Sequence, residues 1–113
     1  MNPGRLIEEI VKWGQDKGID NPDKQTIKLM EECGELAHEI SRGHYYTDDV
    51  KDAIGDIGVV IIILADILDL DFGSCLNTAY EAIKDRKGKT VDGGFIKDDP
   101  TKPHDERVNF QSY

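Results

Sequence analysis

Apolar side chains recur every three or four positions in four stretches of the chain, a spacing that gathers them on one face of an α-helix. The stretches cover about residues 3–16, 22–42, 48–70 and 72–87. The third stretch is rich in β-branched residues, but it is too long for an ordinary strand, so we expect a helix there as well. No segment shows a convincing strand alternation. The pattern therefore predicts an all-α domain built from four helices.

Helix-starting and helix-ending residues agree with these bounds. Pro3 and Pro22 suit the first turn of the first and second helices, and Thr47 can cap the third. Gly43 and Gly88 are expected to end the second and fourth helices. The pair Gly93-Gly94 predicts a turn beyond them. We expect residues 1–97 to form the helical domain and residues 98–113 a C-terminal arm that is irregular or disordered.

Composition narrows the class of protein. The chain has 113 residues and a net charge of −9, so it is expected to be one domain, or one subunit of a larger assembly. A chain this small often gains by burying more surface in an oligomer. The acidity argues against a non-specific binder of nucleic acid or of anionic membranes, because both need a basic surface.

Targeting and redox signals indicate the cytoplasm. The first fifteen residues lack the features of a signal peptide, so we expect no leader. The longest apolar run, residues 57–65, is far below the roughly 20 residues of a membrane helix. Cys33 and Cys75 share no metal-type spacing and are expected to be buried free thiols in a reducing compartment.

Five acidic residues of the second and third predicted helices lie beside the apolar faces rather than opposite them. They are Glu32, Glu35, Glu39, Asp52 and Asp56. An acidic stripe is usually the solvated face of a helix. Asp56, however, is followed by a run of apolar residues, and a buried carboxylate without a partner is costly. Either a salt bridge or a divalent metal held between the two helices must compensate it.

Both solutions have candidates in the sequence. Lys12, Lys28 and Arg42 are the basic residues available for a salt bridge. Oxygen ligands without cysteine favour a hard cation, Mg²⁺ or Mn²⁺, over zinc. Several carboxylates around such ions are typical of phosphoryl-transfer sites.

Two glycines adjoin these acids. Gly34 precedes Glu35 and Gly55 precedes Asp56, in helix interiors where glycine costs about 1 kcal/mol relative to alanine. Glycine is tolerated there when two backbones approach closely. The sequence thus predicts helices drawn together so that the acids converge, with two ordinary packing glycines as the alternative.

Basic residues gather at the end of the fourth predicted helix. They are Lys84, Arg86, Lys87 and Lys89. Such a group could hold the phosphates of a ligand, or it could simply place cations at a helix C-terminus, where the helix dipole favours them.

The acidic motifs carry a family resemblance. The run from Gln25 to Ala37 and the run from Asp52 to Asp56 resemble the MazG-like family of all-α nucleoside triphosphate pyrophosphohydrolases, which is related to dimeric dUTPases and dCTP pyrophosphatases. The run from Ala79 to Lys89, together with Trp13, is similar to short single-domain members found in bacteria and phages. The resemblance covers about residues 5–97. It implies a four-helix bundle assembled as a homodimer or homotetramer.

The family pattern is E-x-x-E, a spacer, then E-x-x-D, with the metal-binding acids on the two central helices. Glu32 and Glu35 match the first pair, and Asp56 matches the final aspartate. Ala53 stands where the family usually has glutamate. Asp52, one turn before Asp56, is the expected substitute ligand. The implied cofactor is Mg²⁺, with Mn²⁺ as the alternative.

The resemblance implies a reaction and a role for each residue. Water attacks a nucleoside triphosphate between the α and β phosphorus atoms and gives a monophosphate and pyrophosphate. Glu35 and Asp56 would anchor the metal, and Glu32 would bind it or orient the water. The other implied roles fall to substrate-binding residues. Lys84, Arg86 and Lys87 would hold the phosphates, Trp13 or Tyr80 would lie against the base, and Asn77 would hydrogen-bond to it.

Two other classes stay open at this stage. The sequence Glu35-Leu-Ala-His38 is a Glu-x-x-His, the helical unit of di-iron carboxylate bundles, although the third helix offers no second histidine motif. A non-catalytic helical module that binds nucleotides or a partner is the other alternative, and Ala53 is its specific support. Base and sugar preference cannot be derived from spacing.

Overall fold

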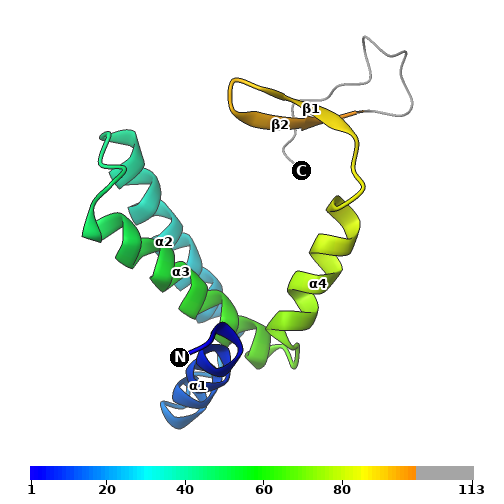
Figure 1. Cartoon of the computed structure of the whole chain (residues 1–113). Helices are drawn as coiled ribbons and strands as arrows, with labels where there is room; N and C mark the ends of the chain where they lie inside the picture. The colour runs from blue at the N-terminus through cyan, green and yellow to red at the C-terminus, as the bar shows by residue number, and fades with distance from the viewer. Residues whose placement is uncertain (99–113) are drawn as a thin grey trace. The chain divides into compact units, whose positions relative to one another are not determined.

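A computed structural model describes residues 1–98 of the chain. Four helices and a β-hairpin follow one another along it (Figure 1): α1 (Pro3–Asp16), α2 (Pro22–Ser41), α3 (Asp48–Ile67), α4 (Phe72–Ile83), β1 (Gly88–Val91) and β2 (Gly94–Lys97). The four predicted helices are confirmed. Residues 99–113, nearly all of the expected arm, lie outside the described residues.

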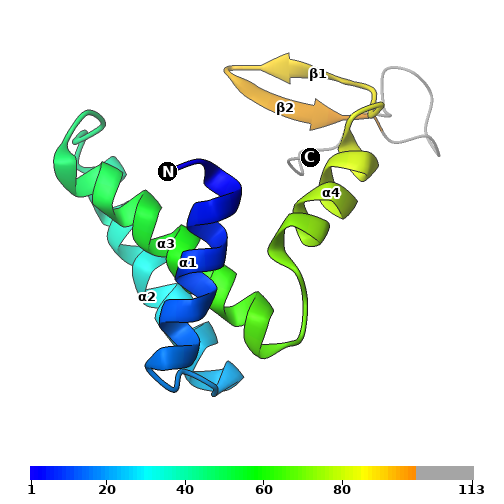
Figure 2. The ribbon, with the colours of Figure 1, turned by 60° about the horizontal axis from the view of Figure 1, so that its bottom comes forward.

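The chain divides into two compact units, Met1–Ser74 and a second that begins at Cys75. In the first unit α2 and α3 lie side by side, and α1 packs against α3 (Figures 1 and 2). Helix α4 starts in the first unit and continues in the second, which also holds the hairpin. None of the described helices combines the length and the apolar character that a membrane span requires.

Side-chain caps begin the first three helices, and the one at Thr47 is the cap that the sequence predicts. Asn2, Asn21 and Thr47 each accept a hydrogen bond from the backbone N–H three residues further on, at 2.8, 3.0 and 3.2 Å. These bonds satisfy donors that have no partner within the helix. Proline in the first turn of α1 and α2 costs nothing there, because it removes an N–H that would be unpaired.

The core of the first unit lies along α3. Its buried apolar side chains are Val50, Ala53, Val60, Ile62, Ile63 and Ala65. Gly14 of α1 is buried against Ile63, and a Cβ atom at Gly14 would lie 3.1 Å from its Cγ1, so this glycine permits the close approach of α1 to α3. Two side-chain hydrogen bonds also join α3 to its neighbours, one from α1 and one from α2. Gln15 Nε2 donates to Asp66 Oδ2 at 3.1 Å, and the buried Gln25 Nε2 donates to the Val60 carbonyl at 3.2 Å.

The role predicted for Gly34 and Gly55 is wrong within the described chain. A Cβ atom at either position would meet no other atom within 4 Å, so neither glycine marks a close approach of helices. The two cysteines are free thiols, as expected, but each is only partly buried.

The second unit differs from the all-α prediction, because residues 88–97 form an antiparallel hairpin. Asp92 and Gly93 have φ values of 50° and 78°, the left-handed conformations of a two-residue type I′ turn. The predicted turn is thus present one residue earlier than Gly93-Gly94. Gly88 begins β1 instead of ending α4. A Cβ there would collide with the Ile96 carbonyl, so the strand itself requires glycine.

Candidate metal and nucleotide site

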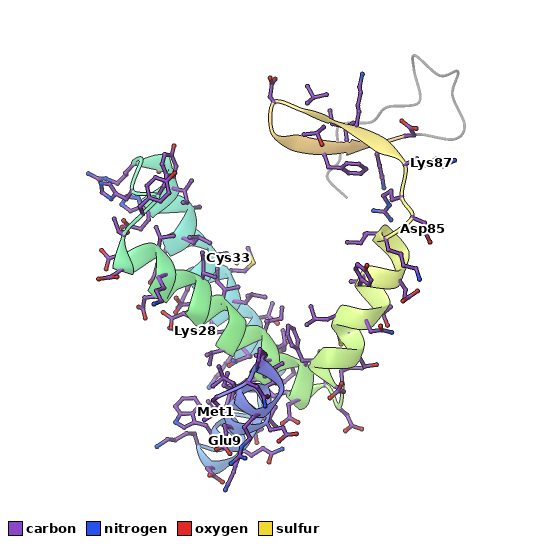
Figure 3. All side chains as sticks on the ribbon, viewed as in Figure 1. Met1, Glu9, Lys28, Cys33, Asp85 and Lys87 are labelled. Carbon is purple, nitrogen blue, oxygen red and sulfur yellow. The ribbon has the colours of Figure 1, made fainter. Side chains whose placement is uncertain are left out.

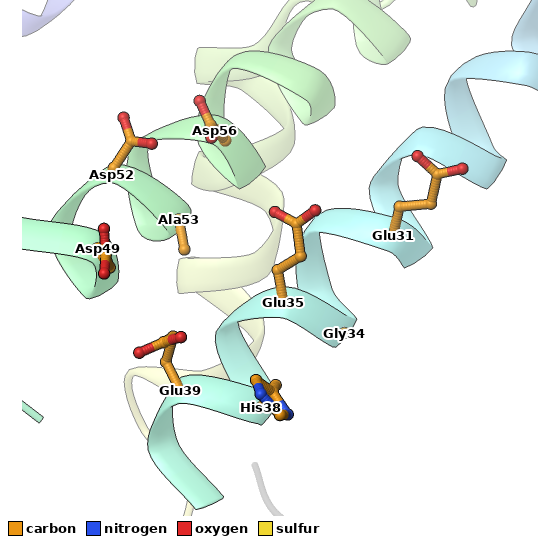
Figure 4. A pocket seen from close by; sticks show the side chains of 9 residues that line it. All are labelled: Glu31, Gly34, Glu35, His38, Glu39, Asp49, Asp52, Ala53 and Asp56. Carbon is orange, nitrogen blue, oxygen red and sulfur yellow. The ribbon is translucent and has the colours of Figure 1, made fainter. Parts of the chain in front are cut away.

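An open cleft of about 580 Å³ lies between α2 and α3 (Figure 4), and we call it the acidic cleft. Its lining residues are Glu31, Gly34, Glu35, His38 and Glu39 from α2 and Asp49, Asp52, Ala53 and Asp56 from α3. Three of the four predicted metal ligands therefore face one cavity. Gly34 forms part of its wall, so the missing side chain leaves room for the cleft rather than drawing the helices together.

Glu35 and Asp56 lie on facing sides of the acidic cleft (Figure 4). The charge of Glu32, together with burial and the charge of Asp56, raises the pKa of Glu35. Burial first, and then the charges of Asp52 and Glu32, raise the pKa of Asp56. The four predicted ligands thus act on one another electrostatically. Such mutual repulsion favours the binding of a cation or a proton.

Glu32 is the most buried of the four predicted ligands, with 7% of its side chain exposed. Its Oε1 atom accepts an ion pair from Lys28 Nζ at 3.0 Å. Its Oε2 atom is buried and has no hydrogen-bond partner among residues 1–98. Lys28, one of the three basic residues proposed to compensate Asp56, thus pairs with Glu32 instead. Lys28 therefore neutralises the charge at Oε1, and Oε2 remains available to a ligand.

A second pocket, of about 560 Å³, shares Asp56 with the acidic cleft, and we call it the Trp13 pocket. Its lining residues are Trp13, Ile19, Gln25, Lys28, Glu32, Asp56, Val59, Val60 and Ile63. Trp13 is half exposed, with the Lys17 ammonium 6.0 Å from its ring. Trp13 thus lines a pocket instead of lying in the core, and its role in base binding stays a prediction.

The donors fit a hard cation in type, since all of them are carboxylates and one buried oxygen lacks a partner. In the positions described for residues 1–98, no three side chains of metal-ligating type lie close enough together to enclose an ion. An ion would have to draw the carboxylates together. Ala53 lines the cleft without offering an oxygen, whereas Asp52 lines it with one.

The substrate-binding residues predicted beyond α3 lie in the second unit. Asn77 and Tyr80 are exposed on α4, Tyr80 to 59%. Because α4 ends at Ile83, the basic group follows the helix instead of forming its last turn, and Lys84 pairs with Glu81 at 2.7 Å. Arg86 is partly buried, and Lys87 is exposed just before β1 (Figure 3). Their role in phosphate binding stays a prediction.

Sequence reasoning gave no site role to several residues that line the two pockets. Glu39 and Asp49 line the acidic cleft, one helical turn from the predicted ligands Glu35 and Asp52, respectively. Glu39 Oε2 pairs with His44 Nδ1 at 2.9 Å. Asp49 lies in the first turn of α3. The step of three or four residues from Glu35 to Glu39 and from Asp49 to Asp52 is the signal that could have identified both.

Most of the chain is similar to known proteins. Residues 21–91 match the family profile described as the MazG nucleotide pyrophosphohydrolase domain. A crystal structure titled as the Bacillus-conserved MazG protein, a nucleotide pyrophosphohydrolase, is similar with a TM-score of 0.63 and 27% identity, covering 77% of this chain and 94% of that one.

A curated relative comes from a phage. An uncharacterized 18.2 kDa protein of the rep-hol intergenic region in Haemophilus phage HP1 (strain HP1c1) is 44% identical over 64 residues, or 54% of this chain. The match spans 38% of that relative's length.

Proposed function

The chain belongs to the MazG nucleotide pyrophosphohydrolase domain family, and from this premise we propose that it hydrolyses a nucleoside triphosphate to a monophosphate and pyrophosphate with Mg²⁺ as cofactor. The observation that supports this most is the pair of facing acids, Glu35 and Asp56, beside the unpartnered oxygen of Glu32. Mn²⁺, another hard cation, would suit the same oxygen ligands.

Each acid has a proposed part. Glu35 and Asp56 would hold the ion from opposite helices, with Asp52 as a further ligand and Glu32 contributing its free Oε2. When bound, a hard divalent cation neutralises phosphate charge and makes water more acidic. Glu32 Oε2 is alternatively available to accept a hydrogen bond from the attacking water. Attack at the α phosphorus breaks its bond to the bridging oxygen, which leaves with pyrophosphate.

The nucleotide would occupy the Trp13 pocket. Trp13 offers an aromatic face for base stacking, which is worth roughly 1–3 kcal/mol per base, next to Glu32 and Asp56. In the second unit, taken by itself, Lys84, Arg86 and Lys87 are proposed to bind phosphate groups, and Asn77 and Tyr80 of α4 are proposed to contact a base.

We propose that the active form is a homodimer or homotetramer in the cytoplasm. Ile27 and Met30 of α2 and Ile54 of α3 are each more than half exposed in the single chain. Exposed apolar side chains of this number and size favour burial against another subunit.

The direct test offers the protein Mg²⁺ and a panel of canonical and modified nucleoside triphosphates, with products separated by ³¹P NMR. Pyrophosphate and a monophosphate in equal amounts support the proposal. Diphosphate and orthophosphate, or no hydrolysis of any triphosphate, contradict it. Iron in the purified protein would favour the di-iron class instead.

A further inference from the structure

Lys28 and Glu32 form an ion pair whose two members lie in different surroundings. The lysine side chain is 53% exposed, whereas the glutamate side chain is 7% exposed. Lys28 lies on α2 (Figure 3), and its ammonium is 3.0 Å from Glu32 Oε1 and 3.9 Å from Glu31 Oε2. A solvated cation thus reaches down one helical turn to a buried anion.

Helix-surface preference does not explain this pair. On isolated helices a glutamate placed four residues before a lysine stabilises better than the reverse order, and here the lysine comes first. The pair is instead required by the burial of Glu32, because a buried carboxylate without a counter-charge is strongly destabilising.

The same ammonium acts on the other acids of the site. It lines the Trp13 pocket together with Glu32 and Asp56, so its charge lies in the same pocket as two of the four predicted ligands. It therefore supplies, from the protein itself, part of the positive charge that a divalent cation would bring to these carboxylates. Two cations that serve one set of anions oppose each other's binding.

We propose that Lys28 is a built-in counter-ion of the metal site, which compensates Glu32 while no ion is bound and lowers the affinity of the site for a divalent cation. This inference rests on the metal site of the proposed function. Lys28 is a positioning residue, since it acts through Glu32. With this counter-ion the acidic site can stay folded without a divalent cation, and it can release a bound cation readily.

The experiment compares variants of the full-length protein. Lys28→Met removes the charge but keeps the length of the side chain, and Lys28→Arg keeps the charge. Lys24→Met is the matched control, because Lys24 is exposed on the same helix, one turn earlier, and lines neither the acidic cleft nor the Trp13 pocket. The double variant Lys28→Met/Glu32→Gln removes both members of the pair.

Two quantities are measured for each variant. One is the midpoint of urea denaturation without divalent ions, and the other is the dissociation constant for Mn²⁺, followed by the EPR signal of the free ion. We expect Lys28→Met to lower the midpoint and to tighten Mn²⁺ binding about tenfold, because it removes a cation a few ångströms from the acids. Lys28→Arg and Lys24→Met should bind Mn²⁺ within about twofold of the wild type.

Three results would overturn the inference. Lys28→Met that binds Mn²⁺ no more tightly than Lys24→Met shows that Lys28 does not compete with the ion. If the double variant is no more stable than Lys28→Met, Lys28 does not compensate Glu32. This comparison holds even where Lys28→Met does not fold. Wild-type protein that binds no Mn²⁺ contradicts both this inference and the proposed metal site. Tighter binding without pyrophosphate release contradicts the proposed reaction alone.

Discussion

Glu32 raises the pKa of Glu35, which lies three residues further along α2. One acid is buried against the core of the first unit and the other faces the acidic cleft, so the effect couples the interior to the site. Across the cleft, Asp52 adds to the effect of burial in raising the pKa of Asp56. The cleft therefore holds mutually repelling carboxylates, which a bound cation would relieve.

The raised pKa of Glu35 predicts how stability depends on pH without metal. The folded protein keeps this proton to higher pH than the unfolded chain does, so the contribution of Glu35 is present at low pH and lost as the pH rises through the raised value. Glu35→Gln cannot ionise and should escape this loss. We expect it to be more stable than the wild type near pH 7, with a smaller difference near pH 4, in urea denaturation with EDTA.

Glu8→Gln on α1 is the matched control, since it removes one exposed carboxylate outside the acidic cleft. It should leave the difference between the two pH values unchanged. Finding Glu35→Gln less stable than the wild type at neutral pH would mean that Glu35 makes a favourable contact in the metal-free protein.

Replacing Ala53 by glutamate should lower the Mg²⁺ concentration that the protein requires. Ala53 is 6% exposed and lines the acidic cleft where the family pattern has glutamate. Ala53→Glu would add a carboxylate to a wall that now offers none, so we expect the Mg²⁺ concentration for half-maximal activity to fall, with turnover equal to or above that of the wild type. Titration of activity with Mg²⁺ measures both quantities.

Ala53→Gln adds the same bulk without the charge and serves as the control. It should raise the Mg²⁺ requirement, because it crowds the cleft and contributes no anion. A severe loss of turnover in Ala53→Glu would show instead that Asp52 binds with a geometry of its own that the added acid disturbs.

Trp13 provides a signal for nucleotide binding, because it is the single tryptophan of the chain. It lines a pocket with Glu32 and Asp56, so a nucleotide bound there should change its fluorescence. We expect Trp13→Ala to raise KM about tenfold, with a smaller effect on kcat, because stacking of a base on an aromatic ring is worth roughly 1–3 kcal/mol. Trp13→Phe keeps an aromatic ring, so its KM should lie between those of the wild type and Trp13→Ala. Unchanged fluorescence at saturating nucleotide would exclude Trp13 from the base site.

Local signals in the sequence predict the helices well. Proline, asparagine and threonine mark the starts of α1 to α3, and these side chains act within four residues, so no tertiary information is needed. The hairpin was missed because its strands are four residues each, too short for an alternation to emerge. The pair Asp92-Gly93 was the available signal, since both residues can adopt a positive φ.

The site was predictable in part. The spacing of the acids along α2 and α3 places each set on one face of its helix. The family resemblance implies that these two faces lie together. Lys28 was proposed as a partner of Asp56 but pairs with Glu32. Glu32 is the more deeply buried acid, and burial is a property of the packed helices. Gly34 and Gly55 were misjudged for the same reason, because an open wall and a close contact both tolerate glycine.

The most direct test of the central claim compares pyrophosphate release by the wild type and by Asp56→Asn in Mg²⁺, under conditions where circular dichroism shows equal helix content. Asp56 lines both pockets and loses its charge with little change of shape. We expect the rate of Asp56→Asn to fall by about a hundredfold or more, since even outer partners of metal ligands are typically worth ten- to a hundredfold. Activity of Asp56→Asn close to that of the wild type would contradict the central claim.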